Sequence, residues 1–404
     1  MANTTLTADI ILKEAHRVFK NNTPFLQGMS RQYDGSFAAH GAKEGTDIRI
    51  RKPQQYTVRT GKTINVQNNV ESSVTLSRST QKGIDLSFSS QELTTDISRF
   101  SELYITPAMN TLAADIEADI LTTAYQSTYN MVGTAGTDPA TALVHLQAGA
   151  KLDEFATRRD GMRSNVLNPA GQAATVDGLK GLFQASEKIR DQYNSGNMGQ
   201  GLGFEFAMSQ NIQNHTVGLI GDNTALVNEG SGVASGDAVI SMDDFSVSAP
   251  TVTKGDVFTI ASVFAVNPVT LDSTGKLQQF VVTAAATGSS NAIADVAVSP
   301  SFVTSGPNQT VSALPANDAA ITFIGTTGLV FAQNLAYHRD AFAFATIDLD
   351  MPDVDFKARE VTDGVSMRIV RDYDVFNDDS IYRIDILYGF VAVTPEWSCR
   401  IAGN

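Results

Sequence analysis

The middle of the chain contains the run Val257-Phe258-Thr259-Ile260-Ala261-Ser262-Val263-Phe264-Ala265-Val266, followed at once by the turn signal Asn267-Pro268. Two more apolar or alternating runs come next, Leu277 to Ala285 and Ala292 to Val298, with Gly288-Ser289 between them. Short runs separated by turn signals are typical of a small antiparallel barrel or sandwich. We therefore expect a β-rich module in the middle of the chain.

Composition sets this module apart from its surroundings. Between Arg190 and Arg339 the sequence has no other arginine and only two lysines, Lys254 and Lys276. Helical patterns precede the module and strand patterns follow it, so the host domain must be assembled from both ends of the chain. A length of 404 residues suggests about two to three domains. We interpret the module as an insertion in an α+β fold.

Helical periodicity marks the host on the N-terminal side. Thr7 can cap a first helix that ends near Asn21, with an apolar stripe at Ile11, Ala15, Val18 and Phe19. Thr106-Pro107 begins the longest helical pattern, which runs to about Tyr129 and buries Met109, Leu112, Ile116, Ile120 and Ala124. We expect Asp115, Glu117 and Asp119 on its solvated face. Further predicted elements are helices at Pro139 to Ala150 and Leu179 to Tyr193, and strands at Phe342 to Ile347, Val365 to Val370 and Ile381 to Val393.

The charge is strongly uneven. From Lys43 to Lys82 there are eight basic residues against three acidic ones, and from Ala345 to Asp385 eleven acidic residues against five basic ones. The basic stretch alternates with period two in several short segments, which predicts a long two-faced hairpin with strands at Thr46 to Arg51, Tyr56 to Arg59, Thr63 to Val66, Val74 to Leu76 and Ile84 to Phe88. Few of its residues are large and apolar, so we expect it to rest on something outside its own fold.

Signals for nucleic-acid, membrane or disulfide chemistry are weak. The net charge of −14 argues against tight binding of nucleic acid, which needs clustered Lys and Arg. No apolar run approaches the roughly 20 residues that span a bilayer, and no basic start followed by an apolar stretch marks a secretory signal. Cys399 is the single cysteine, which we interpret as a small buried apolar residue.

Catalytic and cofactor motifs fail on inspection. Arg59-Thr60-Gly61-Lys62-Thr63 ends like a phosphate-binding loop, but the glycine that the motif requires five residues earlier is Tyr56. No Gly-x-Ser-x-Gly elbow occurs, and the histidines stand far apart, at His16, His40, His145, His215 and His338. We assign no catalytic, cofactor-binding or metal-binding residue and predict that the chain is not an enzyme.

One acidic cluster needs a separate interpretation. Asp348, Asp350, Asp353 and Asp355 follow one another at short spacing, with Pro352 between the two pairs. Period two would place Asp348 and Asp350 on one strand face, where a hard cation could bind. The spacing of an EF-hand loop is absent, so an acidic edge that faces solvent or a partner is favoured.

Three stretches carry a resemblance to a known family. They are Leu6-Thr7-Ala8-Asp9-Ile10 through Asn22-Thr23-Pro24-Phe25, Lys254-Gly255-Asp256-Val257-Phe258-Thr259-Ile260 through Leu277-Gln278-Gln279-Phe280-Val281-Val282, and Leu387-Tyr388-Gly389-Phe390 through Pro395-Glu396-Trp397. With the order of the elements, they resemble the P22-like coat proteins of tailed bacteriophages across essentially the whole chain. The resemblance implies an α+β, HK97-like capsid fold with an inserted antiparallel β-barrel of six strands.

The resemblance also implies a division into parts. These would be an N-terminal arm at 1–42, an extended loop at 43–90, a peripheral domain with the spine helix at 91–135 and 340–404, an axial domain at 136–222 and 326–339, and the inserted barrel at 223–325. The implied function is a major capsid protein that self-assembles through head-to-tail contacts into an icosahedral shell around a double-stranded DNA genome. Two alternatives stay open: an encapsulin-like nanocompartment shell, and a protein whose β-module binds a ligand.

The implied partners are further copies of the chain, as hexamers and pentamers of the shell, with a scaffolding protein and a portal protein. A decoration protein is left open, DNA would be contained without specific binding, and no membrane is involved. The location would be the virion capsid, assembled in the host cytoplasm. As candidates for contacts between subunits we take the basic Arg49, Arg51, Lys52, Arg59 and Lys62 and the acidic Asp348, Asp350, Asp353 and Asp355.

Overall fold

The structure is a computed structural model that describes residues 8–31, 47–59, 61–64, 66–67, 72–77, 80–89, 101–179 and 199–404. The chain divides into two compact units. The first comprises Met1–Ile50, Ser73–Ile120 and Phe342–Val393, and the second comprises Arg51–Ser72, Leu121–Ala341 and Thr394–Asn404. Both units therefore combine segments from the two ends of the chain. The finer five-part division stays a prediction.

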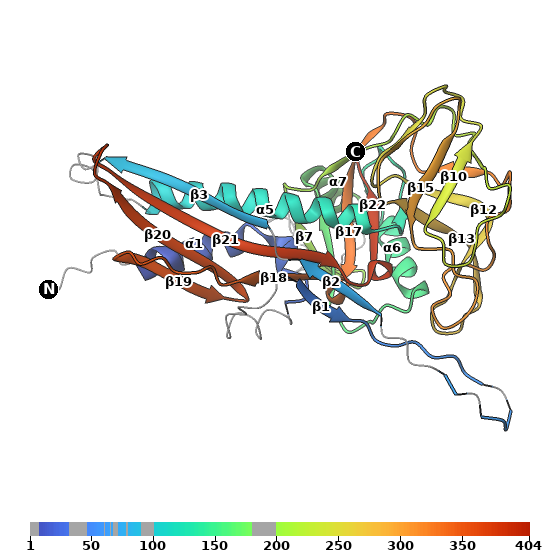
Figure 1. The fold of residues 1–404 in the computed structure, drawn as a ribbon, viewed down its shortest axis with the longest axis horizontal. Helices are drawn as coiled ribbons and strands as arrows, with labels where there is room; N and C mark the ends of the chain where they lie inside the picture. Colours follow the sequence, from blue (N-terminus) through green and yellow to red (C-terminus); the bar gives the residue numbers. More distant parts are fainter. Residues whose placement is uncertain are drawn as a thin grey trace. The chain divides into compact units, whose positions relative to one another are not determined.

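The first unit is organised around one long strand, β21 (Asp379–Ala392). Residues 379–385 of β21 pair with β20 (Val365–Asp374), and residues 387–392 pair with β18 (Phe342–Ile347). Along residues 379–388 it also pairs with β3 (Thr80–Ser89), while β19 (Phe356–Thr362) adds to β20. All these pairs are antiparallel, as Figure 1 shows. The strand predictions at Phe342, Val365 and Ile381 are confirmed.

Helices α1 (Ala8–Asn21), α2 (Pro24–Gln27) and the N-terminal part of α5 (Thr106–Ser127), preceded by the π-helical turn η1 (Ser101–Ile105), complete the first unit. The apolar stripes predicted for α1 and α5 are buried, which confirms both helices. The expectation of a solvated acidic face on α5 is wrong for Glu117. Its side chain is fully buried and accepts a hydrogen bond of 2.9 Å from the backbone N–H of Phe25. A carboxylate thus binds a backbone amide in the first turn of α2, where helices leave N–H groups without an intrahelical acceptor.

The second unit contains a mixed sheet. Its order is β4 (Met131–Val132), β22 (Ser398–Ala402), β17 (Val330–His338), β5 (Arg163–Leu167), β7 (Phe204–Met208) and β6 (Gln200–Gly201), with β8 (Asn214–Thr216) also on β17. The pairs β22–β4 and β5–β7 are parallel. Helices α6 (Ala142–Glu154) and α7 (Pro169–Leu179) also belong to this unit, and α6 begins three residues later than predicted. Two short 3-10 turns, η2 (Arg339–Ala341) and η3 (Pro395–Trp397), complete it.

An antiparallel barrel is inserted between β8 and β17. Its strand order is β16 (Ile321–Phe323), β12 (Val257–Val266), β13 (Ser273–Val282), β15 (Ile293–Ser299), β10 (Val239–Asp243) and β9 (Leu226–Val227). Hydrogen bonds from Val227 N to Ala319 O, 3.0 Å, and from Ile321 N to Ala225 O, 2.8 Å, join the last strand to the first. A closed barrel leaves no long free edge. The predicted inserted barrel is confirmed, and a two-stranded ribbon, β11 (Thr251–Val252) with β14 (Ala286–Thr287), accompanies it.

Aromatic side chains fill the barrel. Phe258 packs against Phe280 and Phe323, with ring centroids 5.8 and 5.3 Å away, and Phe302 lies 4.8 Å from Phe280. All four are buried. Each such aromatic pair contributes about 0.5–1.5 kcal/mol beyond the burial of its area. Most residues of the run that predicted β12 are buried, whereas Ala261 and Ser262 are exposed.

The two connections through which the chain passes between the mixed sheet and the barrel lie side by side. Thr216, the last residue of β8, is opposite Val330, the first of β17, in an antiparallel ladder. Val217 N continues the ladder with a hydrogen bond of 3.0 Å to Leu329 O. The insertion therefore leaves and re-enters the host fold at one place.

Two predictions around the basic stretch turn out differently. Strands form at β1 (Asp47–Arg51) and β2 (Ser73–Ser77), but the described residues of Tyr56 to Arg59 and Thr63 to Val66 form no strand, so those two predictions are wrong. The helix predicted at Leu179 to Tyr193 lies, except for Leu179, outside the described residues. Within the described ranges, no helix is long and apolar enough to cross a membrane.

Gly83 is required where β3 lies against β21. A Cβ at this position would come within 2.4 Å of Asp385 Oδ1 and 2.6 Å of Ile384 O. Asp385 is itself buried and binds Arg368 and Arg383, at 2.5 and 2.8 Å, so it has no room to move.

We expect Gly83→Ala to lower the free energy of unfolding by about 1–3 kcal/mol, the usual cost of overpacking. Thermal unfolding measures the change, with Ser87→Ala at an exposed position of the same strand as the control. Identical melting of the two variants would show that β3 does not pair closely with β21.

Candidate intersubunit surfaces

The segment between β1 and β2, residues 52–72, is called the basic arm from here on; in Figure 1 it is the thin blue extension between those two strands. At its base Lys52 N donates to Ser72 O at 2.9 Å. Further out, the amide side chain of Gln67 binds both backbone groups of Thr57, accepting from Thr57 N at 2.9 Å and donating to Thr57 O. A side chain here takes the place of a backbone ladder, which explains why the alternating sequence forms no strand.

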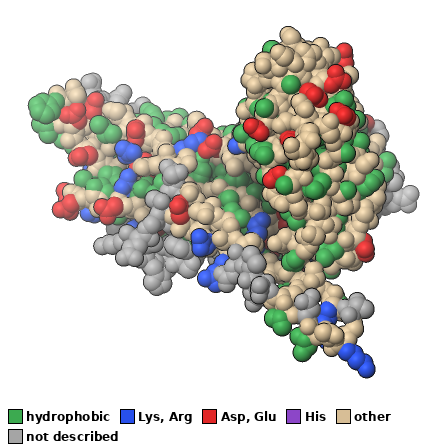
Figure 2. Space-filling view, turned by 45° about the vertical axis from the view of Figure 1, so that its right-hand side comes forward, with side chains coloured by type: hydrophobic (Ala, Val, Ile, Leu, Met, Phe, Trp, Pro, Cys, Tyr) green, Lys and Arg blue, Asp and Glu red, His purple; other side chains and the backbone are tan. Residues whose placement is uncertain are grey.

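Apolar side chains on the basic arm stand in water. The exposed fractions are 61% for Tyr56, 97% for Val58, 78% for Ile64 and 82% for Val66. Figure 2 shows hydrophobic side chains together with Lys and Arg along this arm. Contiguous exposed apolar side chains rimmed by charge mark a surface for another protein. The sequence pattern pointed to such a surface only indirectly, through its lack of an inward apolar face.

The basic candidates are not equivalent. Arg49 and Arg51 lie on the exposed face of β1, and Lys62 is exposed near the end of the arm. Arg59 bends back, donating from Nη1 to the carbonyl oxygens of Gly61 and, at 3.2 Å, Thr63. Its guanidinium therefore stiffens the turn at the end of the arm.

Lys52 lies close to a carboxyl group of its own unit. Burial raises the pKa of Glu396, and the nearby positive charge of Lys52 partly offsets that rise. The charge of Lys52, at the base of the arm, therefore favours the ionised form of Glu396 within the same subunit.

The acidic candidates also differ. The strand β18 ends at Ile347, so Asp348 and Asp350 do not share a strand face as predicted. Asp348 accepts a hydrogen bond of 2.6 Å from Ser366 Oγ and lies 3.4 Å from Arg359, with 5% of its side chain exposed. Asp350, Asp353 and Asp355 are exposed. Of this cluster, three residues are thus open to a partner and Asp348 is engaged within its own subunit.

Within the described ranges, no group of three His, Cys, Asp or Glu side chains is placed to hold a metal ion. The described histidines are hydrogen-bonded to other groups of the chain. His145 lies between Asn165 Nδ2 at 3.0 Å and Thr175 Oγ1 at 3.2 Å, and His338 Nε2 is 3.1 Å from Asp160. His40 lies outside the described residues. Cys399 is fully buried, and burial raises the pKa of its thiol to about 12, so the interpretation as a buried apolar residue is confirmed.

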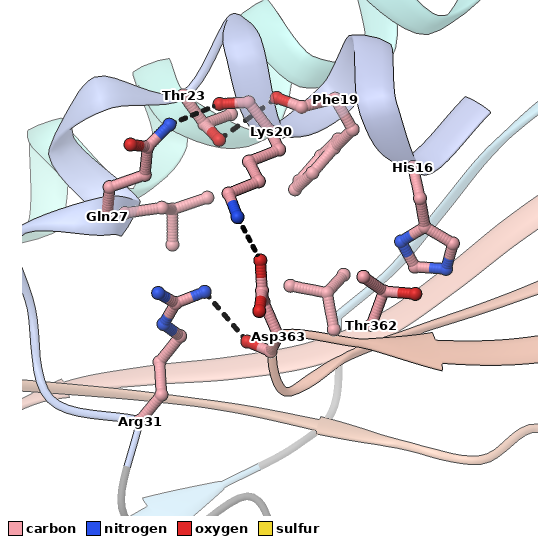
Figure 3. Close-up of a pocket in the computed structure, with 10 residues that line it drawn as sticks. His16, Phe19, Lys20, Thr23, Gln27, Arg31, Thr362 and Asp363 are labelled. Carbon is pink, nitrogen blue, oxygen red and sulfur yellow. Dashed lines mark hydrogen bonds and ion pairs between the residues drawn. The ribbon is translucent and has the colours of Figure 1, made fainter. Parts of the chain in front are cut away.

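A small pocket between α1 and the β19–β20 turn is drawn in Figure 3. Its charged groups bind one another: Lys20 pairs with Asp363, Arg31 Nη1 donates to Asp363 O at 2.7 Å, and His16 Nε2 lies 3.0 Å from Glu360 O. The cation of Lys20 lowers the pKa of Asp363. These contacts anchor α1 on the turn and do not offer converging free groups to a ligand.

A buried polar junction joins the barrel to the mixed sheet. Asp256, directly before β12, accepts from His215 Nε2 at 2.8 Å and from Thr253 N at 2.7 Å. Arg400 of β22 is fully buried and donates from Nη1 to Gly255 O at 2.8 Å. Burial lowers the pKa of Arg400 to about 10, so the guanidinium stays cationic at neutral pH. It also lies over the ring of Tyr125, 5.8 Å from the centroid.

We expect Asp256→Asn to cost about 1–3 kcal/mol of unfolding free energy, because the buried carboxylate accepts hydrogen bonds from His215 and Thr253 and its charge also acts on the buried cation of Arg400. The matched control is Lys276→Gln, which breaks the exposed ion pair with Glu154 and costs at most about 1 kcal/mol. Urea unfolding compares the two variants. Equal denaturation midpoints would mean that the junction adds no stability.

A family model described as "P22 coat protein - gene protein 5" matches residues 1–403. The structure of Mycobacterium phage Che8 is 13% identical, covers 94% of this chain and 90% of its own, and has a TM-score of 0.49. The acidic stable capsid of Helicobacter pylori bacteriophage KHP30 is 11% identical, with 95% and 91% covered and a TM-score of 0.43.

A solved structure titled "CUS-3 coat protein I-domain" is 27% identical over 26% of this chain and 97% of its own, with a TM-score of 0.19. No curated protein matches the chain in sequence. The family model defines the class of protein, a phage coat protein. Because that match runs through residues 1–403, the chain belongs to the P22 coat protein family, and it is a major capsid protein that forms a shell. The nanocompartment and ligand-binding alternatives are not favoured.

Proposed function

We propose that copies of this chain assemble by head-to-tail contacts into an icosahedral shell that encloses a double-stranded DNA phage genome. The family match across residues 1–403 carries the proposal. An HK97-type core and the five-part domain division follow from the same membership. The proposal assigns the chain a structural role without catalysis, and assembly in the host cytoplasm.

The basic arm supports a head-to-tail mode of assembly. Its apolar side chains are exposed, and a narrow two-segment arm cannot cover them itself. A heterologous contact, in which the arm of each copy lies on the next copy, closes into rings when the rotation closes. Hexamers and pentamers of one chain are built in this way.

Partners beyond the chain itself follow from the family. We propose a scaffolding protein that guides closure and a portal protein at one vertex, with a decoration protein as an optional addition. The formal charge of −14 suits a container for DNA, because an acidic lining does not grip phosphate.

Electron microscopy of the purified protein, expressed alone and together with its scaffolding protein, tests the assembly. We expect closed or partial shells in at least one of the two preparations. A stable monomer in both preparations would contradict self-assembly as the function.

The basic arm is also expected to steer assembly by its charge. Changing Arg49, Arg51, Arg59 and Lys62 together to Gln should slow assembly about tenfold at low salt and remove most of its salt dependence. Light scattering follows the rate. Changing Lys254 and Lys276 to Gln, both exposed on the inserted module, is the control and should leave the rate unchanged. An unaltered rate and salt dependence in the fourfold variant would mean that the charges serve solubility only.

A further inference from the structure

The turn between β20 and β21 presents two apolar side chains to water. Residues 372–379, called the acidic tip from here on, have the sequence Asp372-Tyr373-Asp374-Val375-Phe376-Asn377-Asp378-Asp379. Val375 is 77% exposed and Phe376 is 99% exposed. Figure 2 shows hydrophobic side chains with acidic ones beside them at the end of this hairpin. A phenylalanine held fully in water contributes nothing to the packing of its own subunit.

The acidic tip is held in shape by its own side chains. Asp374 accepts from Phe376 N at 2.9 Å and from Asn377 Nδ2 at 2.7 Å. Tyr373 Oη donates to Asp378 Oδ1 at 2.6 Å. The two apolar side chains are therefore presented on an ordered turn, so a partner that binds them need not supply the free energy to order it.

The charge of the acidic tip selects what can cover it. Residues 372–379 contain four aspartates and no Lys or Arg. Arg371, the nearest cation in sequence, lies over the ring of Phe356, 4.6 Å from the centroid, and thus faces its own sheet. Two such tips would repel each other, so a partner surface must combine apolar side chains with positive charge.

The basic arm has this combination. Residues 52–67 contain Lys52, Arg59 and Lys62 and no acidic residue. Val58, Ile64 and Val66 are each more than three quarters exposed. The exposed segment at Asp350 to Asp355, by contrast, has no side chain among the strongly exposed apolar residues.

We propose that Phe376 and Val375 of one copy pack on the exposed apolar side chains of the basic arm of a second copy, with the aspartates of the acidic tip facing Arg59 and Lys62. This contact deepens the proposed shell function and rests on it. It assigns the acidic side of the contact with the arm to the acidic tip and not to the acidic candidates Asp350, Asp353 and Asp355.

Mixing two cysteine variants tests the contact between copies. One protein carries Phe376→Cys and the other Val58→Cys, and the native Cys399 is fully buried. After joint assembly and oxidation with copper phenanthroline, we expect disulfide-linked dimers in the mixture. Each variant assembled alone should give few. Dimers from Phe376→Cys alone would show that tips meet tips and would overturn the proposal.

Electron microscopy distinguishes a failure of the tip contact from a failure of shell assembly. If electron microscopy shows shells but the mixture yields no more dimers than the single variants, the tip contact is wrong and the shell function stands. If the wild-type protein forms no shells, both are wrong.

A second pair of variants checks the apolar part without cysteine. Phe376→Ser should weaken assembly about tenfold to hundredfold, the loss expected for one buried phenylalanine, whereas Phe376→Leu should keep most of it. Val361→Ser, at an exposed apolar position of β19, is the control. Unchanged thermal unfolding of the monomers shows that folding is intact. Equal assembly by Phe376→Ser and wild type would contradict the proposal.

Discussion

The ladder between β8 and β17 is the contact on which the second unit depends. An insertion of about a hundred residues fits a sheet only where its two ends meet, and here Thr216 and Val330 are paired. The same strand, β17, pairs with β22 from the C-terminus and with β5 from the first half of the chain. One strand thus holds the barrel, the mixed sheet and the end of the chain together. The buried junction of Asp256 and Arg400 adds directional contacts at the same place.

Buried charged side chains in this chain make specific contacts, whereas some large apolar side chains on its surface are uncovered. Inside, Glu117 accepts from an amide, and Arg400 donates from Nη1 to a carbonyl and lies over an aromatic ring, while its Nε and Nη2 have no hydrogen-bond partner among the described residues. Outside, Val58 and Phe376 are left almost wholly in water. A monomer gains nothing from this; in the contact we propose, the free energy of covering those side chains is released when copies meet.

Periodicity predicted the parts whose neighbours are fixed by burial. The run Val257 to Val266 matches β12, and Phe342 to Ile347 matches β18, because both strands are buried by adjacent strands. Periodicity gave wrong strand predictions on the basic arm. There the side chain of Gln67, and not a strand-to-strand ladder, binds the backbone of Thr57. Periodicity also missed Glu117 and the acidic tip, since no local pattern shows that a carboxylate meets an amide 92 residues away or that Phe376 has no cover.

Cryo-electron microscopy of the assembled shell, at a resolution that traces the chain, would show whether the arm of one copy is covered by another. We predict that residues 52–72 of each subunit lie on a neighbouring subunit, with Val58 and Val66 buried there. An arm folded onto its own subunit, or still exposed in the closed shell, would contradict it.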